Sequence, residues 1–153
     1  MRQRLIAAVA LLAASAGVTV ADDRMHTYAD ATGKTITTEW WQTMASCAGR
    51  LKVLSGWAVT QSKPEVKALE ERTTMFWLLS VHRLKKDRGI NEDDAARLAL
   101  GSAQSMAQIQ EQGINVYSAA GKMDAEYQQK LAVCEDHLNA YAAAFPEDFG
   151  GKQ

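Results

Sequence analysis

The chain has 153 residues, of which 47% are hydrophobic, and its 17 basic and 18 acidic side chains give a formal net charge of −1. This balance carries no electrostatic footprint for nucleic acid, which proteins hold through clustered Lys and Arg, so we expect no nucleic-acid partner. The length suits one domain with a sizeable core.

Residues 1–21 have the layout of a secretory signal peptide. Arg2 and Arg4 form a basic start, an apolar run covers 5–20, and small residues precede the acidic Asp22. An uncleaved anchor is the alternative, but the run is short for about 30 Å of hydrocarbon and no basic flank follows it. We therefore expect an exported protein, periplasmic or secreted, with no membrane span after cleavage and 132 residues of net charge −3.

Cys47 and Cys134 are the only cysteines in the chain. In an exported protein they predict a disulfide, and two cysteines allow one connectivity. Closing a loop of this length stabilises a fold by roughly 4 to 5 kcal/mol in the chain-entropy model. The alternative is a pair of free thiols in a metal site, which an oxidising compartment disfavours.

The segment 22–37 shows no sustained helical period and no strand pattern, and we expect an extended or mobile lead-in there. A helix then begins near Thr37 or Thr38, either of which is a suitable cap, and runs to about Thr60. Its apolar residues recur every three or four positions, which predicts one buried face. That face consists of Trp40, Met44, Cys47, Leu51, Leu54 and Ala58.

A second helix is predicted after Ser62, where a serine, an early proline and Glu65 resemble a capping box. Its middle, Met75–Val81, is apolar on nearly every side, so we expect part of it to face a partner. Basic residues suit the negative end of the helix dipole, and Gly89 is a good terminator. The basic residues are Arg83, Lys85, Lys86 and Arg88, and contact of this cluster with anionic lipid or an acidic partner is the alternative.

Asn91 caps a third predicted helix, which we expect to end at Gly113. Many small residues on this helix allow a neighbouring backbone to approach closely. Its predicted core face is Ala95, Leu98, Ser102, Met106 and Ile109.

The fourth predicted helix covers Met123 to Phe145 and is stopped by Pro146, after which the tail 147–153 should fray. Its apolar residues repeat the spacing of the first helix, with the cysteine again third. They are Tyr127, Leu131, Cys134, Leu138, Tyr141 and Phe145.

Four helices of about 20 residues with short links predict an all-α fold, an antiparallel up-down-up-down four-helix bundle. We expect residues 38–146 to form its single domain. The shared spacing places the Cys47–Cys134 disulfide between the first and fourth helices.

In such a bundle the disulfide would bring Met44 and His137 to one level. Methionine and histidine are axial ligands for haem iron and soft ligands for copper. The arrangement is similar to that of periplasmic four-helix b-type cytochromes, in which a methionine on the first helix and a histidine on the last hold the haem. This resemblance implies a haem-binding protein, and the ligand chemistry of the two residues leaves copper as the other cofactor. The alternative is that Met44 fills core volume and His137 lies on the rim.

No enzyme class is indicated by the motifs. The chain has no G-x-S-x-G elbow, no phosphate-binding glycine loop and no H-E-x-x-H pair. His82 lies near a helix C-terminus, where a histidine commonly complements the dipole, although a ligand or proton carrier is the alternative. His26 lies in the lead-in and indicates nothing by itself.

The aromatic residues suggest binding. Adjacent helical positions differ by about 100° in direction, so Trp40 and Trp41 cannot both point into the core centre. Tryptophan is also enriched at binding hot spots. The alternative is that all four tryptophans cover the bundle core from its edges. The leading hypothesis is therefore a non-enzymatic protein that binds another protein or peptide, as an inhibitor, immunity-type protein, assembly factor or holdase. Self-association through the apolar stretch of the second helix is an alternative. The candidate partner-binding residues are Trp41, Trp57, Phe76 and Trp77.

Overall fold

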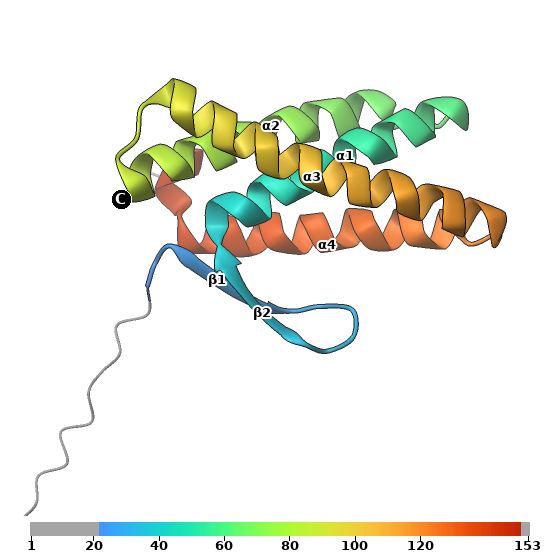
Figure 1. Ribbon diagram of the computed structural model, residues 1–153, viewed down its shortest axis with the longest axis horizontal. Helices are drawn as coiled ribbons and strands as arrows, with labels where there is room; N and C mark the ends of the chain where they lie inside the picture. The colour runs from blue at the N-terminus through green and yellow to red at the C-terminus, as the bar shows by residue number, and fades with distance from the viewer. Residues whose placement is uncertain (1–21, 151–153) are drawn as a thin grey trace, which may run out of the picture.

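A computed structural model describes residues 22–150, which form a two-stranded hairpin, four helices and one short 3-10 turn (Figure 1). The signal peptide expected over residues 1–21 lies outside the described residues. Within the described part, no helix is long and apolar enough to cross a membrane. The elements are β1 (Met25–Ala29), β2 (Thr35–Glu39), α1 (Trp40–Thr60), α2 (Val66–Arg88), α3 (Glu92–Ala119), α4 (Met123–Ala144) and η1 (Pro146–Phe149).

The hairpin corrects the expectation that the segment before the first helix contains no strand. β1 pairs antiparallel with β2, with His26 opposite Thr38. Its turn is fixed by Asp30, whose carboxylate accepts the backbone N–H groups of Thr32 and Lys34 at 2.9 and 3.0 Å. Burial alternates along β1, but its inward residues are a histidine and a tyrosine. The hydrophobic alternation that indicates a strand is therefore absent from the sequence.

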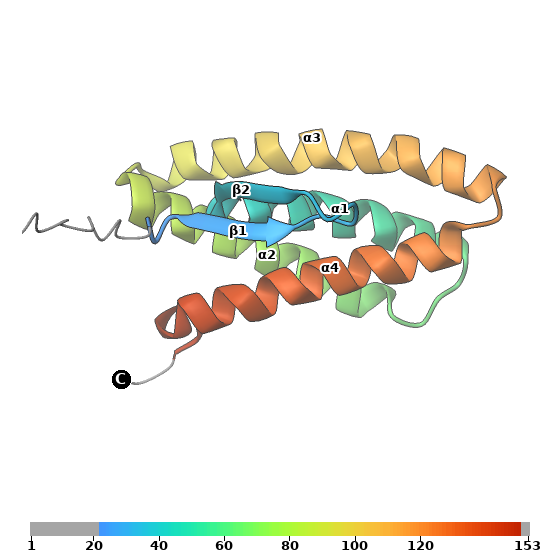
Figure 2. The same cartoon turned by 90° about the horizontal axis from the view of Figure 1, so that it is seen from below.

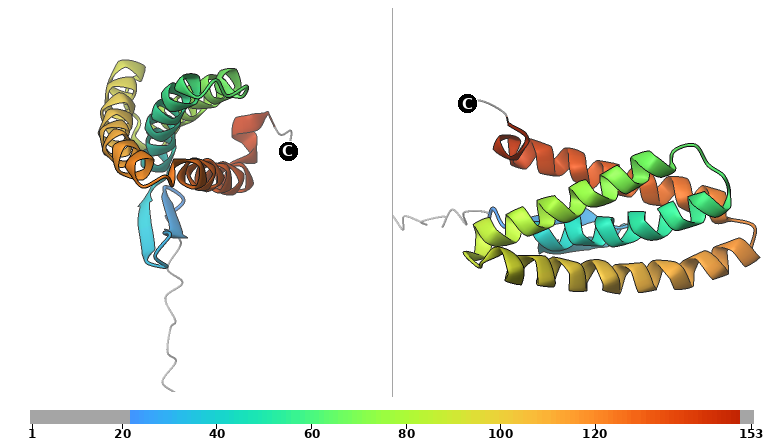
Figure 3. Two further views of the ribbon diagram at one scale, coloured as in Figure 1. Left: turned by 90° about the vertical axis from the view of Figure 1, so that its right-hand side faces the viewer. Right: turned by 90° about the horizontal axis from the view of Figure 1, so that it is seen from above.

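Helix α1 is central and contacts each of the other three helices (Figure 3). The six apolar residues predicted to form its inner face are all buried, which confirms the helical period. The predicted disulfide is confirmed: Cys47 and Cys134 are each 1% exposed and their Cα atoms are 5.6 Å apart. The structure is thus mostly helical, with α1 and α4 covalently joined.

The sequence predicts the C-terminal end of α2 correctly but not its N-terminal cap. Gly89 ends the helix in the left-handed conformation, with φ of 62°, as predicted. The predicted serine cap is wrong, because Ser62 has φ of 52° and belongs to the turn after α1. The residue that precedes α2 is Glu65, whose carboxylate accepts the Tyr127 hydroxyl at 2.9 Å.

Helix α3 differs from its prediction in length and in orientation. Asn91 caps it as expected, accepting the Asp94 N–H at 2.9 Å, but the helix passes Gly113 and ends at Ala119. Leu98 and Ile109, which were predicted to face the core, are 45% and 62% exposed. The buried residues are Ala95, Ala99, Ala103 and Gln110.

The reason for this orientation is a close approach between α3 and α1. A Cβ atom added at Gly49 would lie 2.0 Å from the carbonyl oxygen of Ala103. Only a face of small residues lets two helix backbones come so near, so α3 turns its alanines inward and its larger side chains outward.

Residues 147–149, expected to fray, form part of η1 and fold back onto α2 and α4. The Asp148 carboxylate, 3% exposed, accepts the Tyr141 hydroxyl at 2.6 Å and pairs with Lys86 and His82 at 3.1 and 3.0 Å. The guanidinium of Arg83 lies 3.8 Å from the centre of the Phe145 ring. Much of the basic end of α2 is therefore paired within the chain.

Candidate functional site

The structure separates the four residues predicted to bind a partner. Trp41 and Phe76 are 6% and 1% exposed, so they belong to the core and present no surface. Trp57 is half-buried and packs against Tyr127, with ring centres 5.0 Å apart. The Lys63 ammonium lies 5.1 Å from the centre of the Trp57 ring. Of the four, Trp77 alone lines one of the larger surface hollows described below.

That hollow is a groove between α1, α2 and α3, with a volume of about 920 Å³. Its apolar lining includes Val53, Trp77 and Leu100, and Leu100 is 49% exposed. Polar residues also line the groove. These are Lys52, Thr73, Thr74, Gln104, Gln108 and Glu111.

The groove follows from the sequence of the helices that form it. Where α1 and α3 cross, the facing residues Gly49 and Ala103 have little or no side chain. Further along α1, Gly56 also leaves open space, because an added Cβ there would meet nothing within 4 Å. Small residues thus bring the helices together at one point and leave a hollow beside it that no large side chain fills.

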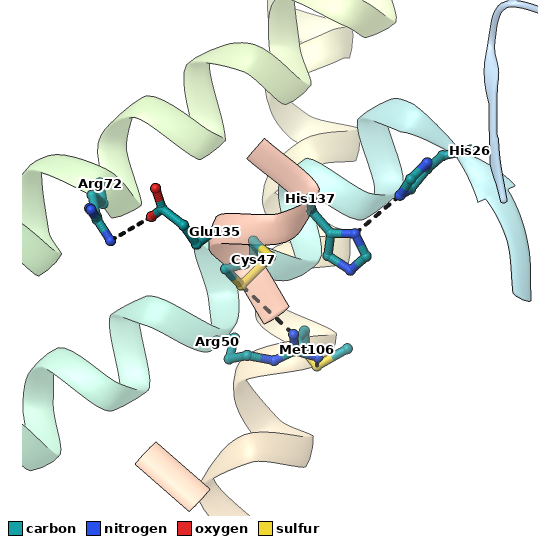
Figure 4. The surroundings of a disulfide bond; sticks show 8 residues. His26, Cys47, Arg50, Arg72, Met106, Glu135 and His137 are labelled. Atoms are coloured by element: carbon teal, nitrogen blue, oxygen red, sulfur yellow. Dashed lines mark hydrogen bonds and ion pairs between the residues drawn. A yellow bond between two sulfur atoms is a disulfide. The ribbon is translucent and has the colours of Figure 1, made fainter. Parts of the chain in front are cut away.

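The residues proposed as haem or copper ligands have different surroundings. Met44 is fully buried in the main core cluster. His137 instead faces the hairpin, where its Nδ1 lies 3.1 Å from Nε2 of His26 in a hydrogen bond (Figure 4). His137 lines two cavities, and Met44 lines neither of them. The pair therefore does not provide two ligands facing a common space, as a haem would require.

The two histidines belong to an aromatic cluster that fixes the hairpin against the helices. Figure 2 shows the hairpin over α1, between α3 and α4. His26 stacks on Trp40 with ring centres 3.9 Å apart, and Tyr28 meets His137 edge-on at 4.5 Å. Burial lowers the pKa of both histidines, and that of His137 falls to about 4 because His26 and Arg50 add repulsion to its burial.

Arg50 lies next to this cluster and beside the disulfide, and its hydrogen-bond partners are weak acceptors. Its Nη1 is 3.7 Å from Sγ of Cys134, and its Nη2 is 4.0 Å from Sδ of Met106 (Figure 4). Its Nε is buried with no hydrogen-bond partner in the described chain. Burial lowers the pKa of this guanidinium. A cation in such a place lacks the carboxylate that normally accompanies it.

Two cavities meet at this point. One, of about 480 Å³, lies between the hairpin and α4, and the other, of about 160 Å³, lies between the hairpin, α1 and α3. Tyr28, Arg50 and His137 line both cavities. Thr43, on the wall of the smaller one, has a buried hydroxyl with no hydrogen-bond partner among the described residues. The site therefore combines open space, a cation and unsatisfied polar atoms.

Sequence reasoning missed this second site. His26 and Tyr28 lie in the strand that was not foreseen. Arg50 carried a signal, because it follows Cys47 by three residues and so lies on nearly the same face of α1 as a buried cysteine. Within residues 22–150, no three His, Cys, Asp or Glu side chains gather as metal ligands.

Comparisons with protein-family models, with curated proteins and with solved structures find no match to this chain.

Proposed function

We propose that the protein is a non-enzymatic binding protein that holds another protein or peptide in the groove between α1, α2 and α3. The observation that carries this proposal is the groove itself, in which Trp77, the half-exposed Leu100 and several polar residues line a concave surface. Trp77 is partly buried and Leu100 is exposed, and large apolar side chains that remain accessible in a concavity are typical of sites that bury a partner.

The shape and chemistry of the groove favour a helical segment as the bound element. An amphipathic helix lays its apolar face into a groove of this kind and places its polar face at the rim. The lining includes both Lys52 and Glu111, so it matches a partner of mixed charge. This occupant would cover Trp77, Leu100 and Val53.

We also propose an antiparallel arrangement of the four helices and a location outside the cytoplasm. Short connections and the α1–α4 disulfide support an antiparallel up-down-up-down arrangement of the four helices. The disulfide also fits a location outside the cytoplasm, since such bonds persist in oxidising compartments. Export through a cleaved leader at residues 1–21, to the periplasm or beyond, is consistent with it.

A site-specific photo-crosslinker tests the groove. The reactive residue is placed at Leu100 in the full chain, expressed in its own host and irradiated in living cells. We expect a covalent adduct with one distinct partner, identified by mass spectrometry. Trp77→Ala in the same chain should reduce the adduct at least tenfold, because hot-spot tryptophans contribute about 2 kcal/mol or more.

Leu98 is the matched control, because it lies on the same helix and is similarly exposed, at 45%. Two residues of separation turn it by about 200° from Leu100, away from the groove. A crosslinker there should give no such adduct. Equal adducts at both positions, or none at Leu100, would refute the proposal. An adduct of two copies of this chain would assign the groove to self-association instead.

A further inference from the structure

The second site carries an inference independent of the groove, since the hairpin lies on the far side of the helices from α2 (Figure 1). Arg50 is the starting point. Its guanidinium has two sulfur contacts of 3.7 and 4.0 Å and an unpartnered, buried Nε. Sulfur is a weak acceptor, so these contacts replace little of the hydration that the cation loses on folding.

The surroundings indicate what would satisfy this cation. Guanidinium groups bind carboxylates with two parallel hydrogen bonds, which is the strongest common pairing for arginine. The larger cavity beside it is also lined by Lys130, Asp30 and Asp136, and the Lys130 ammonium lies 3.8 Å from the Glu126 carboxylate. Because Lys130 has this partner, Arg50 is the cation of the lining that pairs with no carboxylate among the described residues. The two acidic side chains repel a multiply charged anion such as phosphate more than a singly charged one.

The rest of the lining fits an organic body. Tyr28, Val133 and Ala140 form an apolar part of the larger cavity, whose volume of about 480 Å³ accommodates a small molecule. The imidazole of His137 lines the same space, and it is held in place by the hydrogen bond to His26. A ligand with a charged head at Arg50 and an apolar body toward Tyr28 would use both parts.

We propose that the cavity between the hairpin and α4 binds a small organic monocarboxylate, whose carboxylate pairs with the guanidinium of Arg50. The body of the ligand lies against Tyr28 and Val133. The hairpin forms one wall of the site, so binding also fastens the hairpin to α4.

The test uses the full oxidised protein and follows the imidazole resonances of His26 and His137 by NMR. Sodium butyrate and sodium benzoate are titrated at constant ionic strength, with sodium phosphate and sodium chloride as separate arms. We expect saturable shifts with the carboxylates and none with phosphate or chloride. Saturation by phosphate, or no saturable shift with either carboxylate, would overturn the proposal.

Arg50→Met is the decisive variant, and Arg72→Met is its matched control. Arg72 is also an arginine, but it lies on α2 and pairs with the Glu135 carboxylate at 2.9 Å (Figure 4). Arg50→Met should weaken butyrate binding at least tenfold, since it removes a charged double hydrogen bond. Arg72→Met should leave butyrate binding unchanged. Equal binding by the two variants would overturn the assignment.

Stability without ligand gives a second readout that a purely structural arginine would not produce. Removing a half-buried cation that has no carboxylate partner should raise the thermal midpoint of Arg50→Met above that of the wild type. Arg50→Lys keeps the charge and loses the planar fork, so it should fold but bind butyrate about tenfold more weakly. A lowered midpoint in Arg50→Met together with wild-type binding by Arg50→Lys would identify Arg50 as a structural residue only.

Discussion

At Gly49 the backbones of α1 and α3 are in contact, and this single position decides which face α3 turns inward. Gly49→Ala would place a methyl group 2.0 Å from a backbone carbonyl oxygen. A backbone atom cannot move aside as a flexible side chain can, so the helices would have to separate. We expect a loss of about 2 to 3 kcal/mol in unfolding free energy, measured by urea denaturation.

Gly56→Ala on the same helix is the control for that loss. An added Cβ there meets nothing within 4 Å. Replacing glycine by alanine inside a helix should then raise the free energy of unfolding by about 0.5 to 1 kcal/mol. If both variants change stability in the same direction, the close approach does not govern the packing of α3.

The hairpin is held to the helices by histidines, so its docking should depend on pH. Burial lowers the pKa of His137 from 6.5 to about 4, and it also lowers that of His26. Between pH 6.5 and 4 the unfolded chain therefore binds more protons than the folded one, and stability falls as the pH falls. For His137 this loss of stability extends from about pH 6.5 down to about pH 4.

Urea unfolding at pH 7.5, 6 and 5 measures this dependence. His137→Gln removes the proton-binding group but keeps a hydrogen-bonding side chain, so its unfolding free energy should change less over the same range. A wild-type protein equally stable at pH 7.5 and pH 5 would contradict the assignment, as would a variant with the wild-type slope.

The elements differ in how far their sequences predict them. The apolar residues of α1 and α4 are large and strictly spaced, and a helical period of that kind indicates both the helix and its buried face. In α3 the same helical spacing predicted that Leu98 and Ile109 are buried, but both are exposed in the structure. The close contact at Gly49 and Ala103 overrides the preference for burying larger side chains, and no spacing within one helix reveals it.

The candidate sites show the same limit. Trp77 could be proposed from its place in an apolar stretch, whereas Phe76 beside it is buried. Arg50, Tyr28 and His26 gain their meaning only when the hairpin folds back over α1, a contact between segments that are more than ten residues apart. Tertiary contacts of this kind leave no local pattern in the sequence.

At the scale of the whole molecule, the disulfide joins α4 to α1 behind the hairpin cavity, while the groove is formed by α1, α2 and α3. Replacing Cys47 and Cys134 together by alanine should lower the unfolding free energy by about 4 kcal/mol, because the bond closes a long loop in the unfolded chain. Urea denaturation of this variant and of the oxidised wild type measures the difference. Dithiothreitol should destabilise the wild type and leave the variant unchanged.

The same variant separates the two proposed sites. Without the covalent link, α4 can move relative to α1, and the carboxylate site has walls on both α4 and α1. We therefore expect the double alanine variant to bind butyrate more weakly by NMR while it keeps the photo-crosslink from Leu100. The opposite result, loss of the crosslink with retained butyrate binding, would show that the groove depends on the disulfide and the hairpin cavity does not. That result would contradict the structure, in which the disulfide joins α4 to α1 and the groove is formed by α1, α2 and α3.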